Sequence, residues 1–276
     1  MSESAAAYVS RALSRLDAEV PGLLLRVHRQ SDAEAIHDLR VTVRRIRTLL
    51  AVARPLFGRH YVDDIRGTYT RLARATGALR DEEVFRALVD KHRAALAPEL
   101  QEAAERFLGA REERERALRA RALEELAKDD VSRARGTLSA LLSLPVRPKK
   151  DQPLHAFARK AVLQAMGRVD EHRDAKDDDA AGLHDLRIAY KRLRYTMELF
   201  MPALPPDLVA GYDLSVRFQK RLGDLHDLDL ALLELSSASR DDSALAAALT
   251  PVLVAARSKK LAAFRGEMFP TVADAD

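Results

Sequence analysis

One eleven-residue sequence motif occurs twice in the chain, and it constrains the fold more than any other feature. HDLRVTVRRIR spans residues 37–47 and HDLRIAYKRLR spans residues 184–194, with the same residue at six of the eleven positions. At about 100° per residue, the histidine and the aligned cations of each copy fall within roughly 80° of one helix face, and apolar residues fall on the other side. Each copy therefore predicts an amphipathic helix with a cationic stripe.

The stripes contain no acidic residue. Opposite charges one helical turn away normally accompany the cations of an exposed helix, and here they are missing. A solvated surface remains one interpretation, but a bound anion explains better why mutually repelling cations are aligned twice. The first stripe holds His37, Arg40, Arg44 and Arg47, with Arg45 on its flank, and the second holds His184, Arg187, Lys191, Arg194 and Tyr195, with Arg192 on its flank.

The repetition extends to other helices. RLARATGALRDEEV (71–84) corresponds to RFQKRLGDLHDLDL (217–230) at an offset of 146 residues. We expect each central glycine, Gly77 and Gly223, to end a helix and each following aspartate, Asp81 and Asp227, to cap the next one. At this offset the cation pairs are Arg71 with Arg217, Arg74 with Lys220, Arg111 with Arg257, and Arg114 with Lys260.

Composition favours helices throughout. Ala, Leu, Arg and Glu dominate, Gly and Pro number only 11 each, and no long stretch alternates with period two. Asp32 and Asp179 are placed to cap the two basic helices. SLPVRPKKDQP (143–153) carries three prolines and predicts a linker. We expect an all-α fold of two pseudo-symmetric helical bundles facing a central basic groove, with the first half at 1–145, the linker at 146–153 and the second half at 154–276.

The repeated pattern resembles the CHAD family, the conserved histidine α-helical domain. Both copies read His-x-x-Arg-x-x-x-(Arg/Lys)-Arg-x-Arg, and each is followed by Leu-(Arg/His)-Asp-x-(Asp/Glu). The resemblance covers essentially the whole chain and implies binding of inorganic polyphosphate in a basic groove. Two positions depart from symmetry, because Thr48 stands where the second copy has Tyr195 and Arg80 where it has His226.

These observations define a set of candidate polyphosphate-binding residues. Aligned Arg and Lys side chains can contact successive phosphates of a linear polyanion, and Arg offers paired donors. The set is His37, Arg40, Arg44, Arg45, Arg47, Arg71, Arg74, Arg111, Arg114, His184, Arg187, Lys191, Arg192, Arg194, Tyr195, Arg217, Lys220, Arg257 and Lys260.

Three other functions stay open. Single-stranded nucleic acid is a rival ligand, although the stripes offer few aromatic residues for stacking bases. Three His-Asp doublets, at 37–38, 184–185 and 226–227, allow a metal-dependent phosphohydrolase, but cations on the same helix turns oppose a divalent ion. A helical scaffold that binds a protein partner is the third. We expect a protein that is not an enzyme and has no metal and no cofactor.

The sequence also bears on location. The longest apolar run, at 244–256, is too short to span a membrane and contains Pro251. The N-terminal residues lack the pattern of a secretion signal, and the chain has no cysteine. We therefore expect a cytoplasmic protein without a membrane partner, and the family resemblance implies an association with polyphosphate granules.

Overall fold

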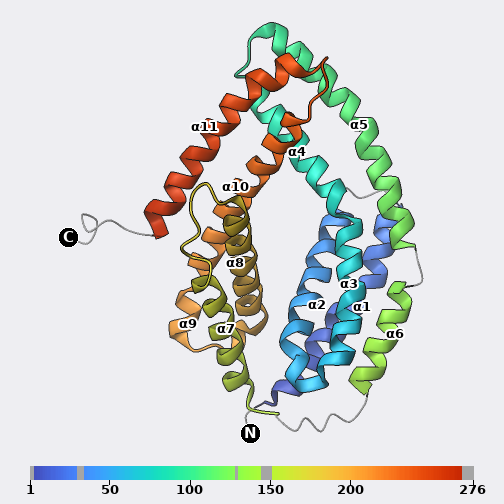
Figure 1. The fold of residues 1–276 in the computed structure, drawn as a ribbon. Coiled ribbons are helices and arrows are strands. Elements are labelled where there is room, and N and C mark those ends of the chain that lie inside the picture. The colour runs from blue at the N-terminus through green and yellow to red at the C-terminus, as the bar shows by residue number, and fades with distance from the viewer. Residues whose placement is uncertain (1–2, 30–33, 128–129, 144–150, 269–276) are drawn as a thin grey trace, which may run out of the picture. The chain divides into compact units, whose positions relative to one another are not determined.

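The protein is all-α, as predicted. The computed structural model describes residues 3–29, 34–127, 130–143 and 151–268, and these contain helices and no strand (Figure 1). None of the helices in these ranges is long and apolar enough to cross a membrane. The elements are α1 (Ala5–Arg29), α2 (Ala35–Phe57), α3 (Arg59–Ala75), α4 (Gly77–Arg93), α5 (Pro98–Leu126), α6 (Asp130–Ser143), α7 (Leu154–Asp170), α8 (Ala180–Phe200), the 3-10 turn η1 (Met201–Ala203), α9 (Pro206–Ala210), α10 (Tyr212–Ser236) and α11 (Ser243–Met268).

The caps of the two basic helices differ. The side chain of Asp179 accepts a hydrogen bond of 2.8 Å from the backbone N–H of Gly182, which confirms that Asp179 caps α8. Helix α2 begins after Glu34, whose side chain makes no capping hydrogen bond. The other predicted cap, Asp32, lies outside the described residues.

The helix break predicted at Gly77 is present, and the one predicted at Gly223 is absent. Helix α3 ends at Ala75 and α4 begins at Gly77, but the predicted cap, Asp81, lies inside α4. Helix α10 runs through Gly223 without interruption, so Asp227 lies in its interior. A glycine inside a helix costs only about 1 kcal/mol, and the buried leucines on either side of Gly223 stabilise α10 by tertiary packing.

The chain forms two compact units, and each contains segments from both halves of the sequence. Unit 1 consists of Met1–Gly77, Arg119–Arg168 and Lys191–Asp213, and unit 2 of Ala78–Leu118, Val169–Tyr190 and Leu214–Asp276. Helices α5 and α8 each contribute residues to both units. The division of the sequence into halves at 1–145 and 154–276 stays a prediction, and most of the expected linker at 146–153 lies outside the described residues.

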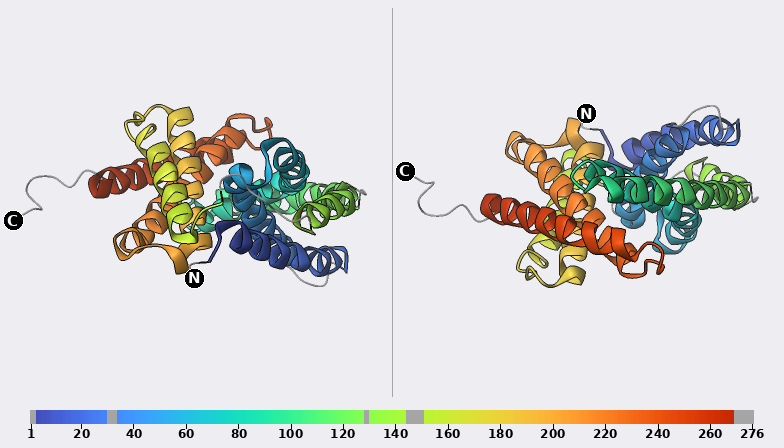
Figure 2. Two further views of the ribbon diagram at one scale, coloured as in Figure 1. Left: turned by 90° about the horizontal axis from the view of Figure 1, so that it is seen from below. Right: turned by 90° about the horizontal axis from the view of Figure 1, so that it is seen from above.

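Unit 1 contains a four-helix bundle. Helix α1 packs on α2, α2 on α3, α3 on α6, and α6 on α1, so the four contacts close a ring (Figures 1 and 2). Tyr8 of α1 and Phe157 of α7 both pack against Phe200 at the end of α8, with each ring centroid 5.8 Å from that of Phe200. These contacts place α7 and the C-terminal part of α8 in the same unit as α2.

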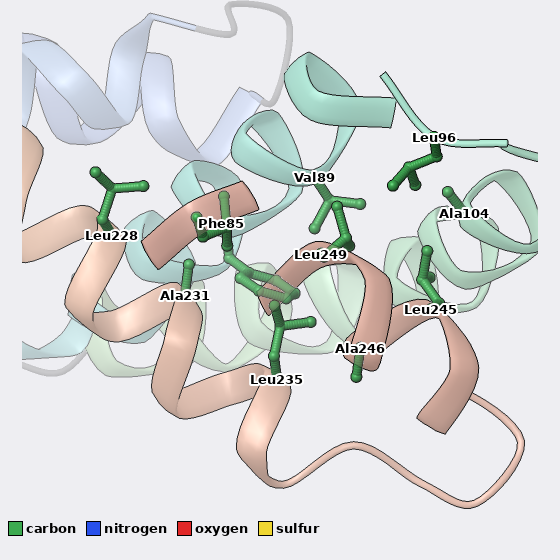
Figure 3. Packing of buried hydrophobic residues seen from close by; sticks show 11 residues of the cluster. Phe85, Val89, Leu96, Ala104, Leu228, Ala231, Leu235, Leu245, Ala246 and Leu249 are labelled. Carbon is green, nitrogen blue, oxygen red and sulfur yellow. The ribbon is translucent and has the colours of Figure 1, made fainter. Parts of the chain in front are cut away.

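Unit 2 has its own apolar core. Side chains from α4, α10 and α11 meet in this core, and Leu96 and Ala104 extend it (Figure 3). Phe85 lies among them and packs edge-on against Phe107 of α5, at a centroid distance of 6.1 Å. Buried leucines recur along α10, which explains why this helix stays continuous.

Candidate functional site

A cluster of arginines lies in unit 1, where α2 meets the C-terminal part of α8. The guanidinium of Arg44 lies 4.4 Å from the ring centroid of Tyr195, and that of Arg194 lies 5.4 Å from it. Tyr195 is only 6% exposed, and burial raises the pKa of its hydroxyl. Two cations from different helices thus share one aromatic ring.

The cluster continues from α2 to α3. Burial lowers the pKa of Arg47, and repulsion from Arg66, Arg74, Arg40 and Arg44 lowers it further. Its Nε donates a hydrogen bond of 3.1 Å to the hydroxyl of Thr70. A neutral acceptor therefore holds the guanidinium of Arg47 in place while its charged neighbours repel it.

Arg40 is also held by neutral groups at the edge of this cluster. Its Nη1 donates to the hydroxyl of Thr76 at 2.8 Å and to the carbonyl of Ala73 at 3.4 Å. These bonds fix the direction of the side chain.

Arg44 is a half-buried cation of this cluster that lies close to other cations. Burial lowers its pKa, and attraction by Tyr195 and Glu198 opposes that shift. Its Nε is buried and has no hydrogen-bond partner within the described ranges. The nearby carboxylate, Glu198, forms an ion pair with Arg45. We refer to Arg40, Arg44, Arg47, Arg66, Arg74 and Arg194 as the arginine cluster, which a polyanion would stabilise.

Several of the predicted cations of unit 2 have carboxylate partners. Arg111 donates to both oxygens of buried Glu82, at 2.6 and 2.7 Å, and to Glu234 at 3.0 Å. Arg114 lies 3.2 Å from Glu82 and 3.6 Å from Glu234. This network satisfies both guanidiniums within the protein.

The same compensation recurs on α11. Arg257 lies 2.5 Å from Asp229, and Lys260 lies 2.5 Å from Asp224. Burial lowers the pKa of Arg187 on α8, while attraction by Asp227 and Asp81 opposes the shift. These cations of unit 2 thus lie close to acids that the helix wheel of a single segment does not reveal.

The remaining candidates occupy separate places. The ring of His184 lies against that of His226, with centroids 4.9 Å apart, whereas His37 is exposed. Arg71 is held by Thr68 at 2.9 Å and by Asp130 at 3.4 Å. Lys191 is half-buried, Arg217 and Lys220 are exposed on α10, and Arg192 lines a separate cavity of unit 1. The predicted groove between the two bundles stays a prediction.

The sequence pattern missed three residues that shape these sites. Arg66 and Arg74 lie two turns apart on α3, with Thr70 between them, and this i, i+4, i+8 spacing could have revealed Arg66. Glu198 lies one turn after Arg194 and could have been noticed in the same way. Glu82 gives no local signal, because its partner Arg111 belongs to another helix.

The described residues contain no group of three or more His, Asp or Glu side chains suited to hold a metal ion. Among the His-Asp doublets, Asp38 forms an ion pair of 2.9 Å with Arg26 of α1. Asp227 lies near Arg187, and burial raises the pKa of its carboxyl group.

Comparison with known proteins identifies the family. The CHAD domain profile matches residues 7–236, so this chain belongs to the CHAD domain family. The chain is 34% identical over 205 residues to two uncharacterized proteins of Mycobacterium tuberculosis, MT2285 of strain CDC 1551 / Oshkosh and Rv2226 of strain H37Rv. The match covers 68% of this chain but only 38% of each relative, so the chain spans well under half of their length.

Two solved structures share the fold. The CHAD domain from the plant Ricinus communis superposes with a TM-score of 0.71 at 24% identity, covering 99% of this chain and 90% of the plant chain. PptA from Streptomyces chartreusis superposes with a TM-score of 0.69 at 19% identity, covering 95% of this chain and 97% of the other.

Proposed function

We propose that this protein binds inorganic polyphosphate without catalysing a reaction on it. The observation that carries the proposal is the arginine cluster, in which six guanidiniums from α2, α3 and α8 lie close enough to repel one another, with Arg44 and Arg194 at Tyr195 and Arg47 at Thr70. Gathering like charges costs free energy, and a multivalent anion offsets that cost.

The geometry of α2 suits a linear chain of phosphates. Arg40, Arg44 and Arg47 lie on one face and rise by about 5 Å per turn, so successive guanidiniums can bind successive phosphates. Each guanidinium can donate two parallel hydrogen bonds to phosphate oxygens. Association with polyphosphate granules belongs to the same proposal.

Tyr195 favours polyphosphate over single-stranded nucleic acid. A base needs an exposed aromatic face on which to stack, and each stacked base contributes about 1–3 kcal/mol. Tyr195 is buried and lies between Arg44 and Arg194, so its ring serves to position cations.

Binding isotherms at several salt concentrations test the proposal. Long-chain polyphosphate should bind far more tightly than orthophosphate or single-stranded DNA of matched charge. The logarithm of its affinity should fall linearly with the logarithm of salt concentration, with a slope of several units, because each neutralised phosphate releases counterions. Equal or tighter binding of DNA at the same ionic strength would refute the preference.

A further inference from the structure

Unit 1 contains a cavity that differs in chemistry from the arginine cluster. It has a volume of about 280 Å³ and lies among the C-terminal part of α2, α7 and α8. Its lining residues are Ala51, Val52, Arg54, Pro55, Leu56, Gln152, Phe157, Lys160, Ala161, Gln164, Arg192 and Thr196. This volume lies close to the lower end of the range of about 300–1,000 Å³ that small-molecule pockets occupy.

The charged side chains that line this cavity are all cations. They are Arg54, Lys160 and Arg192, and no carboxylate is among the described lining residues. Arg54 is partly neutralised by Asp63, 2.6 Å away. Partial burial lowers the pKa of Arg192, and repulsion from Arg168, Arg66 and Arg54 adds to this effect. The cavity therefore attracts an anionic group.

The cavity also offers hydrogen-bond acceptors. Pro55 has no N–H, so α2 cannot satisfy the carbonyl of Ala51 through its usual donor four residues later. The hydroxyl of Thr196 donates to the carbonyl of Arg192 at 2.8 Å, which leaves its oxygen able to accept. The amide oxygens of Gln152 and Gln164 add two further acceptors.

An inorganic polyphosphate cannot use the cations, the hydrogen-bond acceptors and the apolar wall of this cavity together. Its ionised oxygens accept hydrogen bonds and do not donate them, and it has no apolar part to contact Val52, Leu56 and Ala161. A ligand that fits must join a phosphate to an organic body that carries donors. The organic body would lie against the apolar wall, with its donors near the acceptors.

We propose that this cavity binds a nucleoside phosphate, with the phosphates at Lys160 and Arg192 and the nucleoside against α2 and α7. Ribose hydroxyls and base amines supply the donors that the carbonyl of Ala51 and the oxygen of Thr196 can accept. This proposal does not depend on polyphosphate binding, because Arg54 and Lys160 are not part of the arginine cluster.

Isothermal titration calorimetry of the full chain tests the proposal with ADP, tripolyphosphate and ribose 5-phosphate. Because tripolyphosphate is also expected at the arginine cluster, the comparison concerns the binding that Arg192→Glu weakens and Arg44→Gln keeps. In that binding, ADP should be held about tenfold more tightly than either of the others, since only ADP joins phosphates, donors and an apolar ring. Equal or tighter binding of tripolyphosphate that Arg192→Glu abolishes would show a site for inorganic anions in the cavity and overturn the proposal. Equal binding of ribose 5-phosphate would also overturn it, because the base would then contribute nothing.

Charge reversals locate the ligand. Lys160→Glu and Arg192→Glu change exposed side chains, and each should weaken ADP binding about tenfold or more. Lys259→Glu, at an exposed position on α11 in unit 2, is the matched control and should leave the affinity within about twofold. Arg44→Gln should also leave ADP binding intact. A larger loss from Arg44→Gln than from Arg192→Glu would place ADP in the arginine cluster and refute the assignment.

Discussion

The variant Glu82→Ala tests whether the ion pair between Glu82 and Arg111 contributes to the stability of the fold. Glu82 is 3% exposed and accepts hydrogen bonds of 2.6 and 2.7 Å from Arg111. The Arg111 guanidinium also lies 4.3 Å from the ring centroid of Phe85, inside an apolar surround. Glu82→Ala therefore leaves a largely buried cation whose remaining carboxylate acceptor among the described residues is Glu234.

The expected loss of stability follows from this geometry. Breaking a buried ion pair by removing one partner costs about 3–5 kcal/mol. The residual bond from Arg111 to Glu234, at 3.0 Å, favours the lower end of that range, so we expect a loss of about 3 kcal/mol. Urea unfolding followed by circular dichroism measures the free energy of unfolding.

Two further variants make this test specific. Glu83→Ala removes the neighbouring acid, which contacts Arg80 at 3.4 Å near the surface, and should cost less than about 1 kcal/mol. The double variant Glu82→Leu with Arg111→Met removes both charges and should recover most of the loss. A cost for Glu82→Ala no larger than that for Glu83→Ala would refute the reasoning and leave Arg111 available to a ligand.

Three other outcomes follow from the fold and the charges. Burial raises the pKa of Asp227, so the stability that its protonated form contributes is present below the pKa of an ordinary aspartate and is lost as pH rises through its pKa in the folded protein. Asp227→Asn should therefore raise the free energy of unfolding at neutral pH. Urea titrations should show this gain shrinking below about pH 4. Fragments 1–145 and 150–276 should lack the thermal transition of the intact chain, because each compact unit needs segments from both; a native-like transition in either fragment would contradict this. Polyphosphate incubated with the protein and magnesium, manganese or zinc should keep its length on gels, whereas phosphate release that is lost in Asp185→Ala would instead indicate a hydrolase.

Local patterns were enough to predict α8 and the character of its surface. A capping aspartate, an apolar face and a row of cations all lie within one segment, and Asp179 does cap the helix. The same reasoning failed at Gly223. The glycine predicts a helix end, but burial of the leucines on both sides stabilises the helix by more than the glycine destabilises it. Helix type was therefore predictable, and helix continuity depended on packing.

The distribution of counter-charges was not predictable from local patterns. The wheel of α2 shows aligned cations but not that Arg45 meets Glu198, 153 residues later in the chain. It likewise does not show that Arg111 meets Glu82, or that Arg257 meets Asp229 from another helix. Only tertiary structure shows which cations meet carboxylates from distant parts of the chain.

The most direct test of the account compares polyphosphate affinity in two variants at one salt concentration. Arg44→Gln removes a cation of the arginine cluster, and Arg257→Gln removes a cation paired with Asp229. Charged hydrogen bonds contribute about 1.5–3 kcal/mol, so Arg44→Gln should weaken binding by about 10- to 150-fold. It should also lower the salt slope by roughly 0.7–0.9. Arg257→Gln should change the affinity less than about threefold. An equal or larger loss from Arg257→Gln would contradict the claim that the arginine cluster of unit 1 binds the polyanion.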